Sequence, residues 1–488
     1  MRQQGKTALV AASAFAAVFS IATLSRYIGR KQHPANRNLT PYIANGEIKE
    51  AQKLSLVTNS STCSQNLRGE DVCFPLSYAG FITVDEKLGN NLFFWYFPSQ
   101  EDPGAPLAIW LNGGPGVSSM FGLFWDNGPL QPAQTTEDNA KNADSKSSNI
   151  RLERRKDSWV GPLSMVYVDN PVGVGYSYST SGDLGVHSTH RQITDDLYEF
   201  LQQFYMLFPE NKRRDLYIGG QSYAGKYVPF LAHRIHEAKK KKETSIPLTG
   251  IYMGGPFFAP EKMLIDQSNY LFNVGAISLA QLKKQRRDYR YLVDKYVRGE
   301  YFPLSVWDEA SRFFHNFPFT NNFVTSEYPD EEAIHDIMTS ELVQNAIGVG
   351  NVTYKVVSWT VRQKLGSTQF FASARRELGE LLDSGSYKVL IYNGDYDVLV
   401  NSEMIDEALL VTRWAGRSEF ANASRKVWTR QRSPVSPREY MGFYSHTGNL
   451  CRVVVHGAGH QVGHDQAEIS KLMISSFVKD GCIKEGTE

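Results

Sequence analysis

The sequence predicts an α/β protein built on a mixed, mostly parallel sheet, and two observations support this fold class. From residue 78 onward, short apolar runs typical of buried strands alternate with helical patterns. Several of these runs end in a glycine-rich turn, the place where open α/β sheets bind their ligands. Strands are expected at residues 92–97, 107–111, 165–168, 215–218, 251–253, 389–392 and 452–455.

The strand pattern stops between residues 258 and 365. Helical spacing at 282–296 and 331–342 predicts a mainly helical insertion, or cap, in this stretch. The expected organisation is therefore a signal segment, an N-terminal arm and a sheet core divided by the cap. The signal segment is expected at 1–25 and the arm at 26–75. The two parts of the core are expected at 76–257 and 366–488, with the cap at 258–365.

Composition excludes several classes of protein. With 488 residues, 42% of them hydrophobic, the chain can bury a large core. A net charge of +1 gives no reason to expect a nucleic-acid or acidic-polymer partner. The basic clusters at 154–156 and 239–242 are interpreted as solvated surface. No pattern implies a metal or an organic cofactor.

The N-terminus and four sequons predict entry into the secretory pathway. Arg2 and Lys6 precede an apolar run at 8–24, as in a secretory signal. An uncleaved signal anchor stays open, because about 17 apolar residues are the lower limit for spanning a bilayer. The Asn-x-Ser/Thr sequons are at Asn38, Asn59, Asn351 and Asn422.

The four cysteines predict two disulfides in an oxidising compartment. They are Cys63, Cys73, Cys451 and Cys482, and three pairings can be drawn. The close pair Cys63 and Cys73 is the first choice. The spacing and the lack of a nearby histidine argue against a zinc site.

Ser222 is the candidate nucleophile. It follows an expected strand and precedes a helical run at 226–239, with Gly220 and Ala224 two residues to either side. A nucleophile on a sharp strand-to-helix turn needs such small neighbours, because the backbone passes close to them. Alone, this string is also typical of an ordinary turn.

Two later segments strengthen that assignment. Asp397 and His460 each follow an expected strand, and the order Ser, Asp, His is that of α/β-hydrolase triads. His460 would remove the Ser222 proton and return it to the leaving group, while Asp397 would orient the imidazole. Spacing alone does not eliminate three neighbours: His456, His464 and Asp395.

The glycine turn at 112–116 completes the constellation. Its backbone can offer an N–H to a developing oxyanion, and the residue after Ser222 can offer a second. A phosphate-binding loop or a plain turn are the alternatives. No Lys-Ser/Thr follows the turn, however, and Gly-x-Gly-x-x-Gly is absent.

These motifs together identify a family resemblance. The strings WLNGGPGVSS at 110–119, DNPVGVGYS at 169–177, QSYAGKYVP at 221–229, YNGDYD at 392–397 and GAGHQVGHDQ at 457–466 resemble the serine carboxypeptidases. All blocks are in order between residues 78 and 477. The segments at 78–84 and 121–124 look most similar to the vitellogenic-like and venom branch.

The resemblance implies a capped α/β-hydrolase fold and removal of C-terminal residues from peptides at acidic pH. It selects Asp397 and His460 over their neighbours. It also implies that the backbone N–H groups of Gly114 and Tyr223 form the oxyanion hole. The substrate carboxylate would be bound by Asn112, with Trp110 close to that subsite.

The sequence departs from the family at the carboxylate site. Gln221 and Asp126 replace two glutamates that share a proton in the family. Gln221 is a permanently neutral donor, so carboxypeptidase activity with a weaker acid preference is expected. Near-isosteric drift and impaired exopeptidase binding are the alternatives. Gln461 and Gly463 replace the Met and Pro that the family usually has after the catalytic His. This change bears on the leaving-group subsite, and so on which side chains it prefers in the released amino acid.

The leading interpretation is thus a secreted or lysosomal serine carboxypeptidase acting on peptide or protein C-termini. An acyltransferase of the same family, using an ester donor, is the second. A catalytically silent binding protein is the third, although the sequence retains every triad position.

Overall fold

The protein is described by a computed structural model over residues 36–57, 63–65, 71–133, 152–300, 321–325, 331–433 and 435–484. The expected signal segment at 1–25 lies outside these residues. Within the described ranges, no helix has the length and apolar character needed to cross a membrane.

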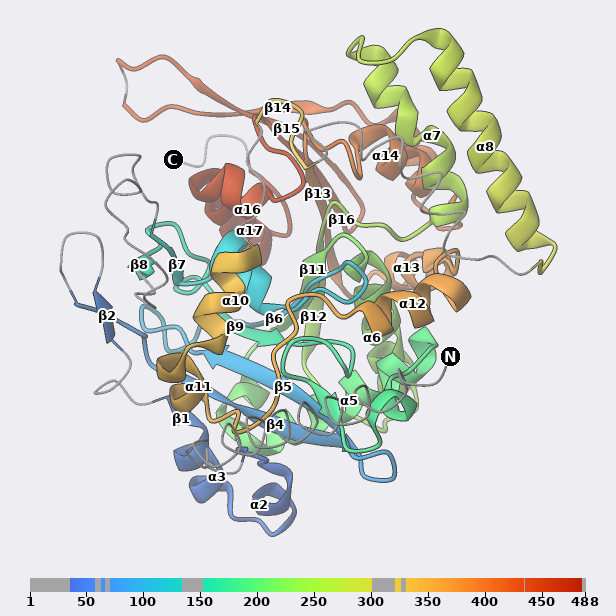
Figure 1. The fold of residues 1–488 in the computed structure, drawn as a ribbon. Helices are drawn as coiled ribbons and strands as arrows, with labels where there is room; N and C mark the ends of the chain where they lie inside the picture. Colours follow the sequence, from blue (N-terminus) through green and yellow to red (C-terminus); the bar gives the residue numbers. More distant parts are fainter. Residues whose placement is uncertain are drawn as a thin grey trace, which may run out of the picture. The chain divides into compact units, whose positions relative to one another are not determined.

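A 12-stranded mixed sheet organises the described chain (Figure 1). Its central strands, from β9 to β16, are parallel, and antiparallel strands extend both edges. The strand order is β1 (Leu56–Val57), β4 (Ser77–Asp85), β5 (Asn90–Phe97), β9 (Ser164–Val168), β6 (Leu107–Leu111), β11 (Leu216–Gln221), β12 (Leu248–Gly254), β13 (Lys388–Gly394), β16 (Leu450–Val455), β15 (Glu439–Thr447) and β14 (Lys426–Arg430), with β10 (Tyr178–Ser179) beside β5. Each of the seven expected strands overlaps one of these, which confirms the predicted α/β architecture.

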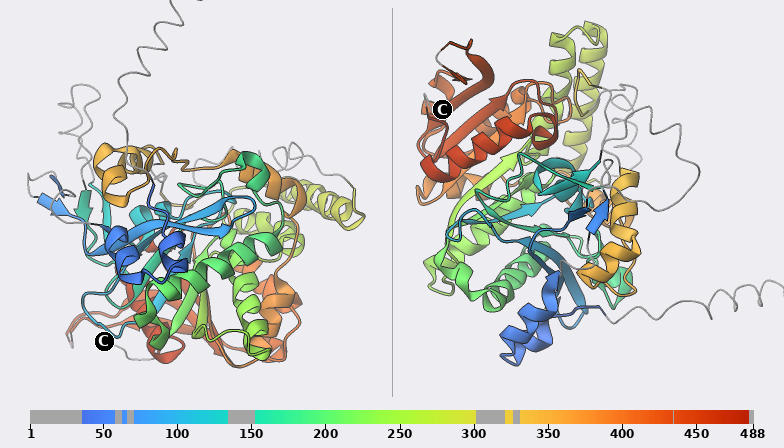
Figure 2. Two further views of the ribbon diagram at one scale, coloured as in Figure 1. Left: turned by 90° about the horizontal axis from the view of Figure 1, so that it is seen from below. Right: turned by 90° about the vertical axis from the view of Figure 1, so that its left-hand side faces the viewer.

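Helices cover both faces of the sheet. Side chains alternate between the faces along each strand. Ile218 therefore packs toward α5 (His190–Leu207) and α6 (Ala224–Lys240), while the neighbouring Tyr217 contacts Phe477 of α17 (Ala467–Asp480). In Figure 2, α10 (Glu331–Thr339) and α11 (Glu341–Ile347) lie on the opposite side from α5 and α6.

The expected cap region is helical where it is described. It contains α7 (Pro260–Asn273), α8 (Leu279–Val297), α10 and α11, and α7 packs against α8 and α14 (Ser402–Val411). The helix expected at 331–342 is two helices, because Ser340 caps a new one. The boundary drawn at 365 falls inside α12 (Trp359–Thr368), and the sheet resumes only at Lys388, after α13 (Arg375–Asp383).

The expected N-terminal arm is part of the core where it is described. It contains α2 (Thr40–Ala44) and α3 (Ile48–Ser55), and Leu39, Ile43 and Ala51 are buried. β1 then joins the sheet edge beside β4. The remaining elements are β2 (Cys63–Gln65), β3 (Asp71–Cys73), β7 (Leu130–Pro132), β8 (Leu152–Arg154), α15 (Arg417–Asn422), α16 (Val462–Asp465), a π-helix η2 (Gly122–Asn127), and the 3-10 helices η3 (Gly182–Gly185) and η4 (Pro209–Arg213).

One disulfide joins Cys451 of β16 to Cys482, just after α17. The expected pairing of Cys63 with Cys73 leaves Cys451 and Cys482 to form the second disulfide, and these are the two that are joined here. Cys73 is disulfide-bonded, and the antiparallel register of β2 and β3 places Cys63 opposite it.

Candidate active site

Ser222 lies on a sharp turn between β11 and α6. Its backbone has φ 61°, in the left-handed region that non-glycine residues rarely adopt. The turn is held by hydrogen bonds from the Ser222 N–H to the Gly254 carbonyl (2.9 Å) and from the Phe257 N–H to the Ser222 carbonyl (2.8 Å). A Cβ on Gly220 would lie 2.1 Å from the Leu111 oxygen, so this position needs glycine.

Asp397 and His460 form a buried pair at the ends of β13 and β16. His460 Nδ1 lies 2.8 Å from Asp397 Oδ2, and Asp397 Oδ1 accepts a hydrogen bond from the Val400 N–H at 2.9 Å. Burial alone would lower the pKa of His460. The charge and hydrogen bond of Asp397, together with the charges of Asp126 and Asp465, outweigh burial and raise that pKa above its usual value.

The three neighbours left open by spacing are engaged elsewhere. His456 Nδ1 lies 2.7 Å from Asp395 Oδ2, in a second Asp–His pair that is partly exposed. The ring of His464 stacks on Trp125 with centroids 4.3 Å apart. His456 and His464 are therefore not the histidine that pairs with Asp397, and Asp395 is not the carboxylate that pairs with His460.

Gly255 brings the serine turn against the Asp–His pair. A Cβ on Gly255 would lie 3.0 Å from both His460 Nδ1 and Asp397 Oδ2. The preceding Gly254 accepts the Ser222 hydrogen bond, so one short segment contacts the serine turn and both partners. Among the described contacts, Ser222 Oγ makes no hydrogen bond to His460; such bonds often tighten only when substrate binds.

The glycine turn after β6 lies beside the nucleophile. A Cβ on Gly113 would lie 2.6 Å from Tyr223 N and 2.8 Å from Ser222 Cβ. Within the described chain, the N–H groups of Gly114 and Tyr223 make no hydrogen bond. Two free backbone donors thus flank the serine.

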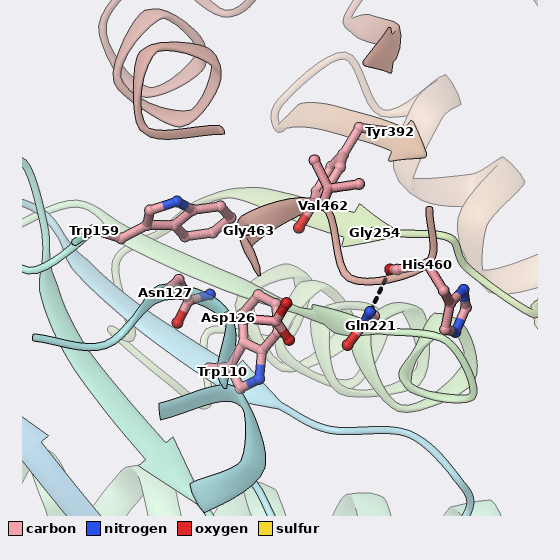
Figure 3. Close-up of a pocket in the computed structure, with 10 residues that line it drawn as sticks. All are labelled: Trp110, Asp126, Asn127, Trp159, Gln221, Gly254, Tyr392, His460, Val462 and Gly463. Carbon is pink, nitrogen blue, oxygen red and sulfur yellow. Dashed lines mark hydrogen bonds between the residues drawn. The ribbon is translucent and has the colours of Figure 1, made fainter. Parts of the chain in front are cut away.

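A narrow pocket adjoins this constellation (Figure 3). Asp126 and Gln221 both line it, and the Gln221 amide nitrogen donates to the His460 carbonyl oxygen. In Figure 3 the His460 imidazole points away from the pocket. The other lining residues are Trp110, Asn127, Trp159, Gly254, Tyr392, Val462 and Gly463.

Asn112 is oriented by Trp110. The indole N–H donates to Asn112 Oδ1 at 2.6 Å, which leaves the Asn112 amide N–H groups as donors for a ligand. Gly122 makes room for this contact, since a Cβ there would lie 2.1 Å from the indole nitrogen. An amide held in this way suits recognition of a carboxylate.

Asp126 is buried, and neither carboxyl oxygen has a hydrogen-bond partner of normal geometry among the described residues. Burial raises its pKa to about 7, and the charge of Arg155 opposes that rise. Gly463 permits the close packing here, because a Cβ on it would lie 2.7 Å from the Asp126 backbone oxygen.

Sequence reasoning included Gly113 in the predicted turn at 112–116 but missed Gly255. Gly255 belongs to a glycine pair that follows an expected strand, which is the same signal that marked the other turns. That signal could have identified the position. It could not have shown that the missing Cβ faces the Asp–His pair, because this contact depends on how three strands end side by side.

The sequons differ in exposure. Asn351 and Asn422 are exposed, and Asn59 lies outside the described residues. Asn38 is partly buried, and its amide nitrogen donates to Thr83 Oγ1 at 2.9 Å and to Asn91 Oδ1 at 3.2 Å. A glycan would leave this nitrogen with one N–H, so modification of Asn38 would cost the fold at least one of these two bonds.

One described cluster has the side chains of a metal site. Ligand atoms of His233, Glu237 and Glu380 lie within 4.8 Å of one another, away from the pocket lining. His233 Nε2 already lies 2.7 Å from Glu380 Oε2, and Glu237 pairs with Lys240. These ion pairs account for the cluster without a metal.

The sheet, the serine turn and the Asp–His pair define the protein as an α/β hydrolase. The family described as serine carboxypeptidase matches residues 70–480, and the chain belongs to this family, as its motifs predicted. It is 33% identical to a probable serine carboxypeptidase (CPVL) from Homo sapiens, over 90% of this chain and 89% of the relative. It is 31% identical to the venom serine carboxypeptidase of Apis mellifera, over 90% of each.

A solved structure supports the fold. A prohormone-processing carboxypeptidase from Saccharomyces cerevisiae superposes with a TM-score of 0.74 at 20% identity, over 89% of this chain and 98% of that one. The protein is therefore a serine carboxypeptidase with an α/β-hydrolase fold, and peptides are its substrates.

Proposed function

We propose that this serine carboxypeptidase releases C-terminal amino acids through an acyl-enzyme on Ser222. His460 takes the Ser222 proton as Oγ attacks the scissile carbonyl carbon, then gives that proton to the departing amino group. Water, deprotonated by the same imidazole, cleaves the ester and restores Ser222. The 2.8 Å contact between Asp397 and His460 carries this proposal, because it fixes the tautomer that a general base needs.

Backbone donors would stabilise the tetrahedral intermediate. The N–H groups of Gly114 and Tyr223 flank Ser222 and make no other hydrogen bond within the described chain. Donors that are fixed before the reaction stabilise the developing oxyanion without reorganisation. We assign these two groups to the oxyanion hole.

The pocket beside His460 would bind the substrate's terminal carboxylate. Asn112, held by Trp110, offers amide N–H groups, and Gln221 keeps one amide hydrogen beyond its bond to the His460 carbonyl. Asp126 can donate only when protonated. Because its pKa is raised to about 7, it does so below neutral pH.

Two ionisations would then shape the pH profile. Protonation of His460 removes the general base toward acid, and ionisation of Asp126 repels the substrate carboxylate above pH 7. Each group shifts the pKa of the other. The two apparent pKa values of the pH profile therefore describe the coupled pair rather than either residue alone. We expect an optimum closer to neutral than that of an enzyme with two paired glutamates.

The test uses an N-blocked dipeptide with a free carboxylate, assayed from pH 4 to 8. The wild type should release the C-terminal amino acid, with kcat/KM at least about 10-fold lower at pH 5 than at pH 7, because His460, whose pKa is raised, is largely protonated at pH 5. The variant Gln221→Glu restores a second carboxyl and should shift the optimum toward acid. A steep loss toward neutral pH in the wild type contradicts the weaker acid preference.

A covalent probe separates the remaining alternatives. A fluorophosphonate should label the wild type and leave Ser222→Ala unlabelled. Labelling without release of an amino acid at any pH would indicate another acyl transfer. Absence of labelling would indicate a silent protein.

We also propose a location in the secretory pathway, in an extracellular or lysosomal compartment. The Cys451–Cys482 disulfide suits an oxidising compartment, and exposed Asn351 and Asn422 are the sequons open to modification. Release into the medium of cultured cells, with a mobility shift after glycan removal, checks this assignment.

A further inference from the structure

Asp169, directly after β9, is a fully buried carboxylate that binds two loops together. Its Oδ1 accepts hydrogen bonds from Ser118 Oγ (2.6 Å) and from the Ser119 N–H (2.9 Å), and its Oδ2 accepts one from the Tyr176 N–H (2.9 Å). All three donors are neutral. Among the described residues, fixed dipoles and no bonded cation therefore hold this carboxylate.

The network leads directly to Asn112. The Asn112 N–H donates to Ser119 Oγ at 3.1 Å, and the same hydroxyl donates to the Val168 carbonyl at 2.5 Å. Asp169 binds the Ser119 backbone, so the position of Asn112 depends on Asp169 through a single residue.

A third segment, at 354–358, closes the network from the far side. Tyr354 is buried, and its hydroxyl donates to Ser118 Oγ at 2.9 Å. Backbone hydrogen bonds also join this segment to both loops: the Ser118 N–H bonds the Val356 carbonyl (2.9 Å), and the Gly175 N–H bonds the Lys355 carbonyl (3.0 Å). The loop after β6 is thus held from two sides.

The geometry requires a carboxylate at position 169. An asparagine would turn an NH₂ donor toward one or more of the three donors that now converge on Asp169. Gly175 is also adapted to this side chain, since a Cβ on it would lie 1.9 Å from Asp169 Oδ2. Burial raises the pKa of Asp169 to about 6, so the ionised group destabilises the fold at neutral pH. A buried carboxylate that lowers stability when ionised is expected to serve a role other than stabilising the fold.

We propose that Asp169 and Tyr354 are positioning residues that hold Asn112 in the orientation that binds the substrate's terminal carboxylate. This inference rests on the proposed role of Asn112. The oxyanion donors depend less on the Tyr354 hydroxyl. Gly113 contacts Tyr223 directly, and the Ser358 N–H holds the Gly116 carbonyl at 2.8 Å.

The test compares two substrates: an N-blocked dipeptide with a free carboxylate, and an N-blocked amino-acid ester that has none. Tyr354→Phe keeps the ring and removes one hydrogen bond, so the protein should fold. The substitution Tyr354→Phe should raise KM for the dipeptide about 3- to 10-fold and should change the rate of ester hydrolysis less than about 2-fold. Asp169→Asn should act in the same direction and more strongly. Tyr289→Phe is the matched control, because it removes a buried tyrosine hydroxyl bonded to Gln267 of α7 and should change neither substrate.

A double-mutant cycle completes the test. In an Asn112→Ala background, Tyr354→Phe should have no further effect on the dipeptide, because the residue it positions is gone. Equal losses on dipeptide and ester, or full additivity with Asn112→Ala, would overturn the inference. If Asn112→Ala itself leaves the dipeptide-to-ester ratio unchanged, the proposed function of Asn112 fails instead, and fluorophosphonate labelling of Ser222 still reports on the nucleophile.

Discussion

Asp397 and His460 lie 2.8 Å apart in a buried pair, and a second pair, Asp395 and His456, lies 2.7 Å apart at the ends of the same two strands. The pairs differ in their surroundings. The first contacts Gly255 beside the Ser222 turn, whereas the second is partly exposed. Only the first can serve a reaction at Ser222.

This difference gives a matched pair of variants. Asp397→Asn should lower kcat on the blocked dipeptide about 10³- to 10⁴-fold, because the amide favours the wrong imidazole tautomer. Asp395→Asn makes the same chemical change two residues away and should leave kcat within about 2-fold. Steady-state kinetics on both proteins check this; similar losses in both would contradict the assignment of Asp397.

The central strands could be predicted because their physical signal is strong. Parallel strands buried on both faces are continuous apolar runs, and β6, with sequence LAIWL, is buried along its whole length. The antiparallel strand β15 lies between β16 and the edge strand β14, and sequence reasoning did not identify it. Its exposed residues recur at every third position rather than every second, and Gly442 lies in its middle, so it carries a weaker strand pattern than the central strands.

Candidate site residues could be selected from the sequence where chemistry fixes the residue type, as at Ser222, Asp397 and His460. Contacts that join distant segments were not predictable. Asp169 reads in sequence as a turn residue. Its bond from Ser118, and the bond that Ser118 accepts from Tyr354, exist only once three loops meet. The closeness of Asp126 to the His460 turn is likewise a product of the fold.

Gly255→Ala should impair the reaction without removing any reacting group. The added Cβ would lie 3.0 Å from His460 Nδ1 and Asp397 Oδ2, and the backbone has φ 46°, so the Asp–His pair must shift. Because displacement of about 1 Å can cost about 100-fold, kcat should fall about 10- to 100-fold. Gly385→Ala is the control: φ is 60° there, but no atom lies within 4 Å of the added carbon. It should lower stability by about 1 kcal/mol and leave kcat unchanged.

Removal of the Cys451–Cys482 disulfide should destabilise the fold. The two cysteines are 31 residues apart and both are buried. Loop-closure entropy for that separation corresponds to about 3 to 4 kcal/mol. Urea unfolding of the double variant Cys451→Ala/Cys482→Ala should show this loss. Reduction of the wild type with thiol also breaks the disulfide of Cys73, so it should cause at least the same loss. A loss below about 1 kcal/mol in both experiments would contradict the prediction.

Asp126 should make stability depend on pH. Its pKa rises from 3.8 to about 7 on folding because of burial, so the folded state keeps a proton that the unfolded state releases between these values. The stability from Asp126 is complete below about pH 4 and is lost as pH rises to about 7. At about 1.4 kcal/mol per pH unit, the loss reaches about 4 kcal/mol.

Asp126→Asn removes this ionisation and keeps the shape of the side chain. Relative to the wild type, the variant should gain stability as pH rises from 4.5 to 8, in urea unfolding at both values. Groups that do not interact with Asp126 titrate alike in both proteins and cancel in the difference, whereas His460, which does interact with it, contributes to the difference. Asp183→Asn, at an exposed carboxyl, is the control and should differ from the wild type equally at both pH values. A difference for Asp126→Asn that does not change with pH would mean that Asp126 is not held protonated, and would remove the basis for its role as a carboxylate-binding donor.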